Sequence, residues 1–513
     1  MQTLKQNITW LWQNAEKILI VIFFLTFTLN IRKVFLTPYS FLNGGFNEYT
    51  TMSFSWADLL MIGIIIIYNI KLLISQFRQA EAAHSLLENV IQIKSSVIRN
   101  YYRKNVSRET LYLLLILGWT GLSIFWSQYR PIAIYRFLTL AEIVFFAFVA
   151  IKCLKNGKWL NLAIFALVFN GLFQSLLGIA QFIHNGSLGI HFLGESIIGS
   201  NIDGVAKILI NGEKHIRAYG TFPHPNILAG FLIIPLFLIL AEFAQRWFLP
   251  TSSHPTPSLL LIRGGGLTDH FPLLDKERAR VRCNKVSHET LLAAFPDWTL
   301  STMALITGSG FILTFSRSAF LGLFLGLLVY ILWIAHSRDL IEKFISYYKF
   351  SIFFIITLIL IAIISMDATS IFSNQSLQER QLYQHVSYET ISIHPVAGVG
   401  IGQFVFSEYL NRPNLQTWQY QPVHNIYLLI FSELGAVGFV LFLLFLISMI
   451  LRIYKNKKNR GDYNLTYIAY YCIMLSFLVI SLFDHYFWDI NLGLLTFALP
   501  LIILYTEMKK NHN

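Results

Sequence analysis

The stretch 226–247, NILAGFLIIPLFLILAEFAQRW, decides the fold class because it is apolar almost from end to end. A run of about 20 such residues crosses the hydrocarbon core of a bilayer, which is about 30 Å thick. Hydrocarbon offers backbone N–H and C=O groups no partner, so a spanning segment must be a helix or part of a closed barrel. No apolar block of this chain alternates with a period of two, which favours helices.

Similar blocks recur along the 513 residues, of which 55% are hydrophobic and 13% charged. The sequence therefore predicts an all-α polytopic membrane protein with about 12 transmembrane helices. The predicted spans lie near 17–36, 58–75, 110–127, 132–153, 159–183, 226–247, 299–315, 318–335, 350–366, 425–451, 465–483 and 486–506. The first block is followed by Arg32-Lys33 without a small-residue cleavage site, so it is interpreted as a retained span.

The net charge of +12 is distributed unevenly along the chain. With the N-terminus inside, most Lys and Arg fall on inside segments, such as 78–108, 152–158, 338–349 and 452–460. This positive-inside bias predicts that both termini are cytoplasmic. The basic segments would then meet anionic lipid headgroups, so membrane lipids are predicted partners and nucleic acid is not.

Long loops divide the chain into four predicted parts. These are 1–225 with an outside loop at 184–225, 226–366 with a cytoplasmic insert at 247–298, an extracytoplasmic cap loop at 367–424, and 425–513. The insert is interpreted as a disordered linker, with a binding role as the alternative. In the cap loop, Ser376-Leu-Gln-Glu379 resembles a capping box and predicts an amphipathic helix over 376–393 that ends at His394-Pro395.

Two arginines stand at the predicted outer mouths of spans. Arg217 precedes Gly220 and the Pro223/Pro225 pair, which indicate a shaped turn, with Asn226 capping the next helix. Arg317 lies between two apolar blocks with almost no loop, and Ser316 adds a hydroxyl beside it. The guanidinium fork suits phosphate oxygens, and a charge at this depth is a functional candidate. The alternative is an interfacial anchor.

His424 closes the cap loop at the start of an apolar block, and Asn425 could cap that helix. Its ordinary pKa near 6.5 suits a general base, although a capping or core histidine is the plainer alternative. Arg380 lies on the predicted cap helix and could contact phosphate or simply face solvent. Arg136, near an outer mouth, could add positive potential.

Other signals do not support a metal or nucleotide site. Gly398-Val-Gly-Ile-Gly402 lacks the strand-to-helix context of a dinucleotide fingerprint. The outside carboxylates do not have metal-ligand spacing and no HExxH occurs, so no metal and no cofactor are predicted. Asp484-His485 is interpreted as a solvated turn.

Four segments together resemble the O-antigen ligase and O-antigen polymerase superfamily. They are Arg217-Ala-Tyr-Gly-Thr-Phe-Pro-His-Pro-Asn226, Phe315-Ser-Arg-Ser-Ala319, His394-Pro-Val-Ala-Gly-Val-Gly-Ile-Gly402 and His424-Asn-Ile-Tyr-Leu-Leu-Ile-Phe-Ser-Glu-Leu-Gly435. The resemblance covers residues 200–445 apart from the insert, which is longer than is usual in the family. It implies a GT-C-like membrane glycosyltransferase of the bacterial cytoplasmic membrane, with its active site on the extracytoplasmic side.

The resemblance also implies roles for particular residues. Arg217 and Arg317, with Arg380, would bind the pyrophosphate of an undecaprenyl-pyrophosphate-linked glycan, and His424 would take the proton from an acceptor hydroxyl. The transfer would be inverting and metal-independent, and the acceptor could be a glycan, a lipid or a protein. The alternatives are a twelve-span transporter or a flippase of lipid-linked sugars, and a scaffold without chemistry.

Overall fold

The computed structural model describes residues 2–84, 107–248, 291–337, 374–458 and 465–510. These residues are mainly helical, and their strands form small two-stranded sheets. Eight of the helices are long and apolar enough to cross a membrane, which confirms a polytopic, mostly helical membrane protein. They are α1 (Gln2–Thr26), α2 (Trp56–His84), α5 (Arg130–Cys153), α6 (Gly157–His184), α7 (Pro225–Phe248), α10 (Arg317–Ser337), α14 (Ile426–Lys458) and α17 (Asn491–Lys510).

Twelve spans are not confirmed. Three of the predicted spans correspond to helices of 16 residues, namely α4 (Arg108–Ser123), α9 (Asp297–Ile312) and α15 (Leu465–Ile480). A helix of this length measures about 24 Å, which is shorter than a hydrocarbon core of about 30 Å. The predicted span 350–366 lies outside the part of the chain that the structure describes, as does most of the predicted insert 247–298.

Two predicted span boundaries are wrong. α1 ends at Thr26, and Arg32–Phe35 form strand β1, which pairs antiparallel with β4 (Met52–Ser55). Burial alternates along β1 with the period of a strand, which a count of apolar residues overlooks. At the other end of the chain, the predicted span 486–506 is divided, because α16 (Tyr486–Asp489) is separated from α17 by the extended residue Ile490.

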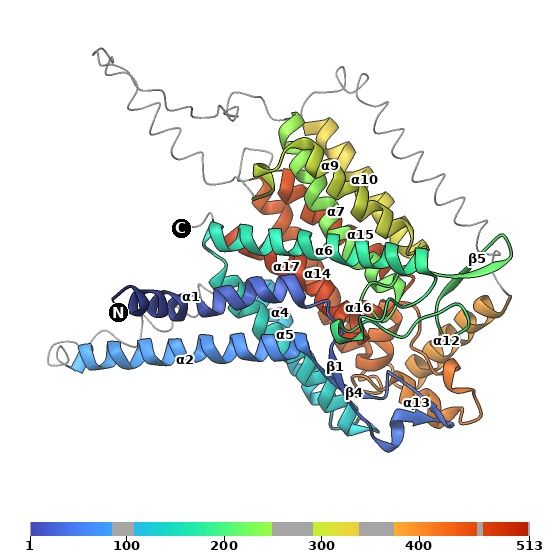
Figure 1. The fold of residues 1–513 in the computed structure, drawn as a ribbon. Coiled ribbons are helices and arrows are strands. Elements are labelled where there is room, and N and C mark those ends of the chain that lie inside the picture. Colours follow the sequence, from blue (N-terminus) through green and yellow to red (C-terminus); the bar gives the residue numbers. More distant parts are fainter. Residues whose placement is uncertain (1, 85–106, 249–290, 338–373, 459–464, 511–513) are drawn as a thin grey trace, which may run out of the picture.

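The loops that the sequence predicts to lie outside contain further short strands, which it did not predict. The first loop carries the pair β2 (Phe41–Leu42) and β3 (Gly45–Phe46) between β1 and β4. In the predicted loop 184–225, β5 (Lys207–Ile210) and β6 (Glu213–Ile216) form a hairpin. These loops are therefore ordered, and Figure 1 shows that the strands and the helices of the cap lie at one end of the bundle, with both chain termini at the other.

α7 is the most buried of the eight helices that could cross a membrane: 89% of its apolar stretch of 18 residues is buried. It packs against α6, α9, α15 and α17. Small residues allow these helices to approach closely: a Cβ on Gly171 of α6 would lie 2.6 Å from the Pro235 ring of α7. Gly322 and Gly326 have the same role where α10 meets α15. This close packing fixes the outer ends of the helices from which the polar loops emerge.

The predicted cap helix 376–393 is confirmed as α12 (Asn374–Ile393), which begins two residues earlier. Its buried residues recur at helical spacing, and α12 packs on α14. At this contact the Ser387 and Ser432 hydroxyl oxygens lie 2.8 Å apart. A short helix, α13 (Phe404–Asn411), completes the cap.

The glycine-rich run after α12 fits into a break in α14. α14 is interrupted at Gly435, whose φ of 65° and ψ of −170° are a combination essentially restricted to glycine. The N–H groups of Val399 and Gly400 donate to the carbonyls of Ser432 and Glu433 at 3.0 and 2.8 Å. The run 398–402 is therefore a structural junction between the cap and α14.

Candidate functional site

Arg217 is fixed at the outer end of α7. Its Nε donates to the Thr314 carbonyl oxygen, and its Nη2 donates to Asn226 Oδ1 at 2.6 Å. The next residue, Ala218, donates its N–H to the Leu313 carbonyl at 2.8 Å. These bonds attach the Arg217 segment to the turn between α9 and α10, so its guanidinium has a defined position.

Arg317 stands at the same turn. It is the first residue of α10 and is exposed, and it follows Phe315, whose φ of 48° makes the reversal of direction tight. Burial lowers the pKa of Arg217 to about 10, and the like charge of Arg317 acts in the same direction. The two arginines therefore form one positive region. Ser316 is buried beside them, and its Oγ has no hydrogen-bond partner among the described residues.

Asn226 connects Arg217 to the loop between α15 and α16. The sequence predicted Asn226 as a helix cap, but α7 already begins at Pro225, and the side chain forms a bridge instead. Its Nδ2 donates to Asp484 Oδ2 at 2.7 Å. The predicted solvated turn at Asp484-His485 is wrong, because these residues are only 6% and 5% exposed. Burial raises the pKa of the Asp484 carboxyl.

His485 contacts two carboxylates, one through its backbone and one through its ring. Its backbone N–H donates to Asp484 Oδ1 at 3.0 Å, and its ring Nδ1 lies 2.9 Å from Asp489 Oδ1. Burial acts to lower the pKa of His485, but the interactions with Asp489 and Asp484 outweigh it, and the pKa is raised. The Asp489 carboxylate therefore stabilises the protonated form of the His485 ring relative to a buried imidazole without this partner.

The His424 ring lies between Tyr383 of α12 and His485. Its centroid is 5.8 Å from that of Tyr383, in a stacked arrangement, and 4.9 Å from that of His485, edge to face. Burial, together with the positive charges of His485 and Arg380, holds the pKa of His424 well below its usual range. His424 is thus a neutral imidazole, and its buried Nδ1 has no hydrogen-bond partner in the described part of the chain.

The remaining predicted residues lie in different places. Arg380 is exposed on α12, and its charge acts on His424, Asp484 and His485. Asn425 caps α14 as predicted, because its Oδ1 accepts the Leu428 N–H at 3.1 Å. Arg136 on α5 is not in this group: its Nη1 donates to the Asp489 carbonyl oxygen, and it lines a separate pocket.

The structure therefore connects the predicted arginines and histidine through residues that the sequence reasoning missed. The contacts run from Arg217 to Asn226, Asp484, His485 and His424, and we call this group the Arg217–His424 site. One sequence signal was available, since His485 and Asp489 are separated by four residues, the spacing of one helical turn. Among the residues that the structure describes, no cluster of His, Cys, Asp and Glu could hold a metal ion.

This fold and this site define a multi-pass membrane protein with a polar, arginine- and histidine-containing site beneath a helical cap. Residues 302–443 match the model of a family described as O-Antigen ligase. The match supports the resemblance noted above, and the matched segment contains Arg317, Arg380 and His424. A comparison with curated proteins found no match.

Proposed function

We propose that the protein is a membrane glycosyltransferase of the O-antigen ligase or polymerase type. It would move a glycan from an undecaprenyl-pyrophosphate donor to an acceptor hydroxyl during the assembly of a cell-surface polysaccharide. The observation that carries this proposal is the chain of contacts from Arg217 to His424, which joins fixed positive charge to a neutral histidine. The family match supports a lipid-linked glycan and an acceptor as the general partners.

In the proposed reaction, Arg217 and Arg317 bind the pyrophosphate. The acceptor oxygen attacks the anomeric carbon, the bond from that carbon to the pyrophosphate oxygen breaks, and its electron pair leaves with undecaprenyl pyrophosphate. Negative charge grows on the leaving group, and guanidinium groups already held in place stabilise it without reorganising. Because Arg217 uses its Nε and Nη2 for Thr314 and Asn226, its remaining N–H groups are available to phosphate oxygens.

The proton of the acceptor hydroxyl goes to the ring of His424. The pKa of His424 is low because the ring is buried near positive charges. A bound pyrophosphate would bring negative charge to the same region and raise the pKa of His424, which makes it a better base once the donor is present. A single displacement of this kind inverts the anomeric centre and requires no metal.

The charge bias supports a location in the bacterial cytoplasmic membrane with the site outside. The basic segment 152–158 and the end of α14 at 452–458 lie toward the end of the bundle that carries the termini, and the cap lies at the other end. With basic segments inside, the Arg217–His424 site faces the extracytoplasmic side, where α12 covers it.

Transfer by the purified protein in lipid nanodiscs tests this function. The donor is a glycan on undecaprenyl pyrophosphate, and the product is followed by mass spectrometry, with and without a chelator. We expect transfer in both conditions and a loss of about a thousandfold or more in His424→Ala, because the proton acceptor is removed. His385→Ala, at an exposed histidine of α12, is the matched control and should retain the activity of the unchanged protein.

Other outcomes would contradict the proposal. Full transfer by a folded His424→Ala variant would remove His424 as the base, and loss of transfer with the chelator would remove metal independence. Reorientation of the intact donor across liposomes, with no new glycosidic bond, would indicate a flippase instead.

A further inference from the structure

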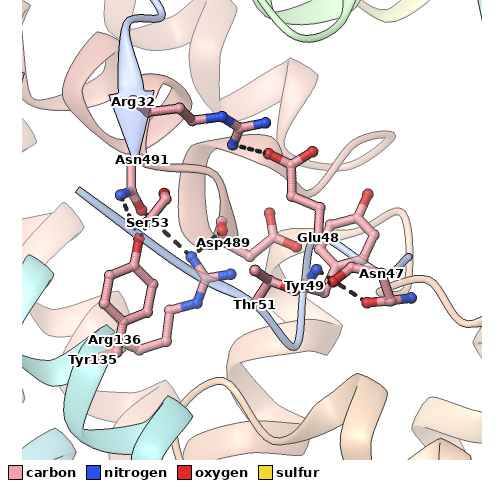
Figure 2. A network of polar contacts seen from close by, with 10 residues as sticks. All are labelled: Arg32, Asn47, Glu48, Tyr49, Thr51, Ser53, Tyr135, Arg136, Asp489 and Asn491. Carbon is pink, nitrogen blue, oxygen red and sulfur yellow. Dashed lines mark hydrogen bonds and ion pairs between the residues drawn. The ribbon is translucent and has the colours of Figure 1, made fainter. Parts of the chain in front are cut away.

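A second polar pocket opens beside the Arg217–His424 site, between the N-terminal strands and the start of α17 (Figure 2). We call it the Arg136 pocket. Its cavity of about 40 Å³ has room for about three water molecules. Many of its lining residues carry polar side chains, among them Arg32, Glu48, Ser53, Tyr135, Arg136 and Asn491. They come from β1, the loop between β3 and β4, β4, α5 and the first residue of α17, and none lies within the segment 302–443 that matches the family.

The strands β1 and β4 present one face to this pocket. The cross-strand pairs Arg32 with Ser55 and Val34 with Ser53 both line it. The alternate pair, Lys33 with Phe54, does not line it, as the period of two along a strand requires. The strand pair that the sequence reasoning missed therefore forms one wall of the Arg136 pocket.

The polar groups of the pocket form a network that is nearly balanced in charge. Asn491 Nδ2 donates to the Tyr135 hydroxyl at 2.8 Å, and Arg136 Nη1 donates to the Asp489 carbonyl oxygen. Arg32 forms an ion pair with Glu48. The lining thus carries two arginines and two carboxylates, those of Glu48 and Asp489, and the Asp489 carboxylate contacts His485 rather than Arg136. Arg136 Nε is buried and has no hydrogen-bond partner among the described residues, so a donor is left unused.

Two lining residues connect the pocket to the proposed base. Tyr49 meets the His485 ring edge to face at a centroid distance of 5.6 Å, and the Asp489 carboxylate contacts His485 Nδ1. His485 in turn contacts the His424 ring. The pocket therefore reaches His485 through Tyr49 and Asp489, whereas Arg217 reaches it through Asn226 and Asp484. Neither Arg217 nor Arg317 lines the pocket, which leaves it available to a second substrate.

We propose that the Arg136 pocket binds an uncharged sugar of the acceptor and directs its hydroxyl toward His424, an inference that rests on the proposed function. Balanced charge disfavours an anion, and a dense set of donors and acceptors suits the hydroxyl groups along one edge of a sugar ring. Those hydroxyls would replace the few waters that the cavity can hold, while the rest of the ring stays at the open mouth.

Sugar binding can be measured without catalysis. The probes are the methyl glycosides of glucose and N-acetylglucosamine, observed by saturation-transfer NMR on the protein in nanodiscs, because maltoside detergents carry sugars themselves. Ser53→Trp should weaken binding of at least one glycoside by about tenfold or more, since the indole fills the cavity. Phe54→Trp, on the opposite face of the same strand, is the matched control and should bind as the unchanged protein does.

The outcomes separate this proposal from the proposed function. His424→Ala should still bind the glycoside, because the pocket does not include that ring. If the protein shows no transferase activity but Ser53→Trp still abolishes glycoside binding, the sugar site would stand and the glycosyltransferase function would be rejected. Equal binding by Ser53→Trp and Phe54→Trp, or displacement of the glycoside by inorganic phosphate, would overturn the sugar site even if transfer occurs.

Discussion

Three histidines meet around the Arg217–His424 site, and their pKa values move in different directions. Burial and the charges of Arg217 and His485 lower the pKa of His224 to about 3, and the pKa of His424 is also lowered. The pKa of His485 is raised, because it contacts the Asp489 carboxylate. The surroundings thus favour protonation of His485 and disfavour protonation of His224 and His424.

The low pKa of His224 predicts a sensitivity to acid. Below about pH 6.5, His224 becomes protonated in the unfolded chain but stays unprotonated in the folded protein. The free energy of unfolding therefore decreases as the pH falls toward 3. His224→Gln removes this difference while keeping an acceptor for the Asn226 N–H. We expect the unchanged protein to lose about 1–2 kcal/mol more than the variant between pH 6.5 and 4.5.

Thermal unfolding across this pH range checks the expectation. The exposed His394 provides the control, because His394→Gln should leave the slope unchanged. If stability depends on pH in the same way in the unchanged protein and in His224→Gln, then His224 takes up its proton in the folded state as readily as in the unfolded chain.

At the scale of elements, the junction of the cap with α14 depends on one break in a helix. Gly435 opens α14, and a Cβ at this position would lie 2.1 Å from the Val396 carbonyl oxygen. The break leaves carbonyl groups of α14 without partners in the helix. Those of Ser432 and Glu433 accept backbone N–H groups of the run 398–402, and that of Leu434 accepts the Trp119 indole N–H at 2.9 Å. The position of α12 over His424 follows from this junction.

Gly435→Ala should therefore separate the cap from α14. The backbone conformation alone costs about 1–3 kcal/mol for a residue with a Cβ, and the clash with Val396 adds to it. We expect a clear fall in melting temperature and a loss of transfer. Gly118→Ala in α4, where a Cβ meets nothing within 4 Å, should be neutral or stabilising by about 1 kcal/mol. An unchanged melting temperature for Gly435→Ala would show that the stability of the protein does not depend on the break in α14 at this residue.

At the scale of the whole molecule, the two ends of the bundle differ in composition. One end carries the termini and basic turns such as 152–158, and the other carries the strands, the cap and the site. This polarity agrees with the positive-inside bias, which acts on short loops close to span ends.

The orientation predicts which side a reagent can reach. Asn414→Cys, exposed in the cap, should react with a membrane-impermeant maleimide on intact spheroplasts, whereas Lys155→Cys, exposed between α5 and α6, should react only after permeabilisation. Cys153 and Cys472 are buried, and the unchanged protein measures the background from all native cysteines. The reverse labelling pattern would place the Arg217–His424 site on the cytoplasmic side.

Much of the helical architecture and part of the site could be predicted from local patterns. The spans near 226–247 and 318–335 and the cap helix agree with α7, α10 and α12 to within two residues. The strand β1 and the burial of Asp484 and His485 could not be predicted in this way. Their environment depends on partners far away in the chain, such as Ser55 for Arg32 and Asn226 for Asp484.

By itself, the sequence determined a multi-pass helical protein, the distribution of its charge, and the arginines and histidine at the ends of its spans. These properties depend on hydropathy and on charge near each span, which can be read locally. Tertiary structure alone decided that the pKa of His485 is raised and that of His424 lowered, and that β1 and β4 wall the Arg136 pocket. Protonation and cavities depend on burial and on neighbouring groups, and packing brings those neighbours together from distant parts of the chain.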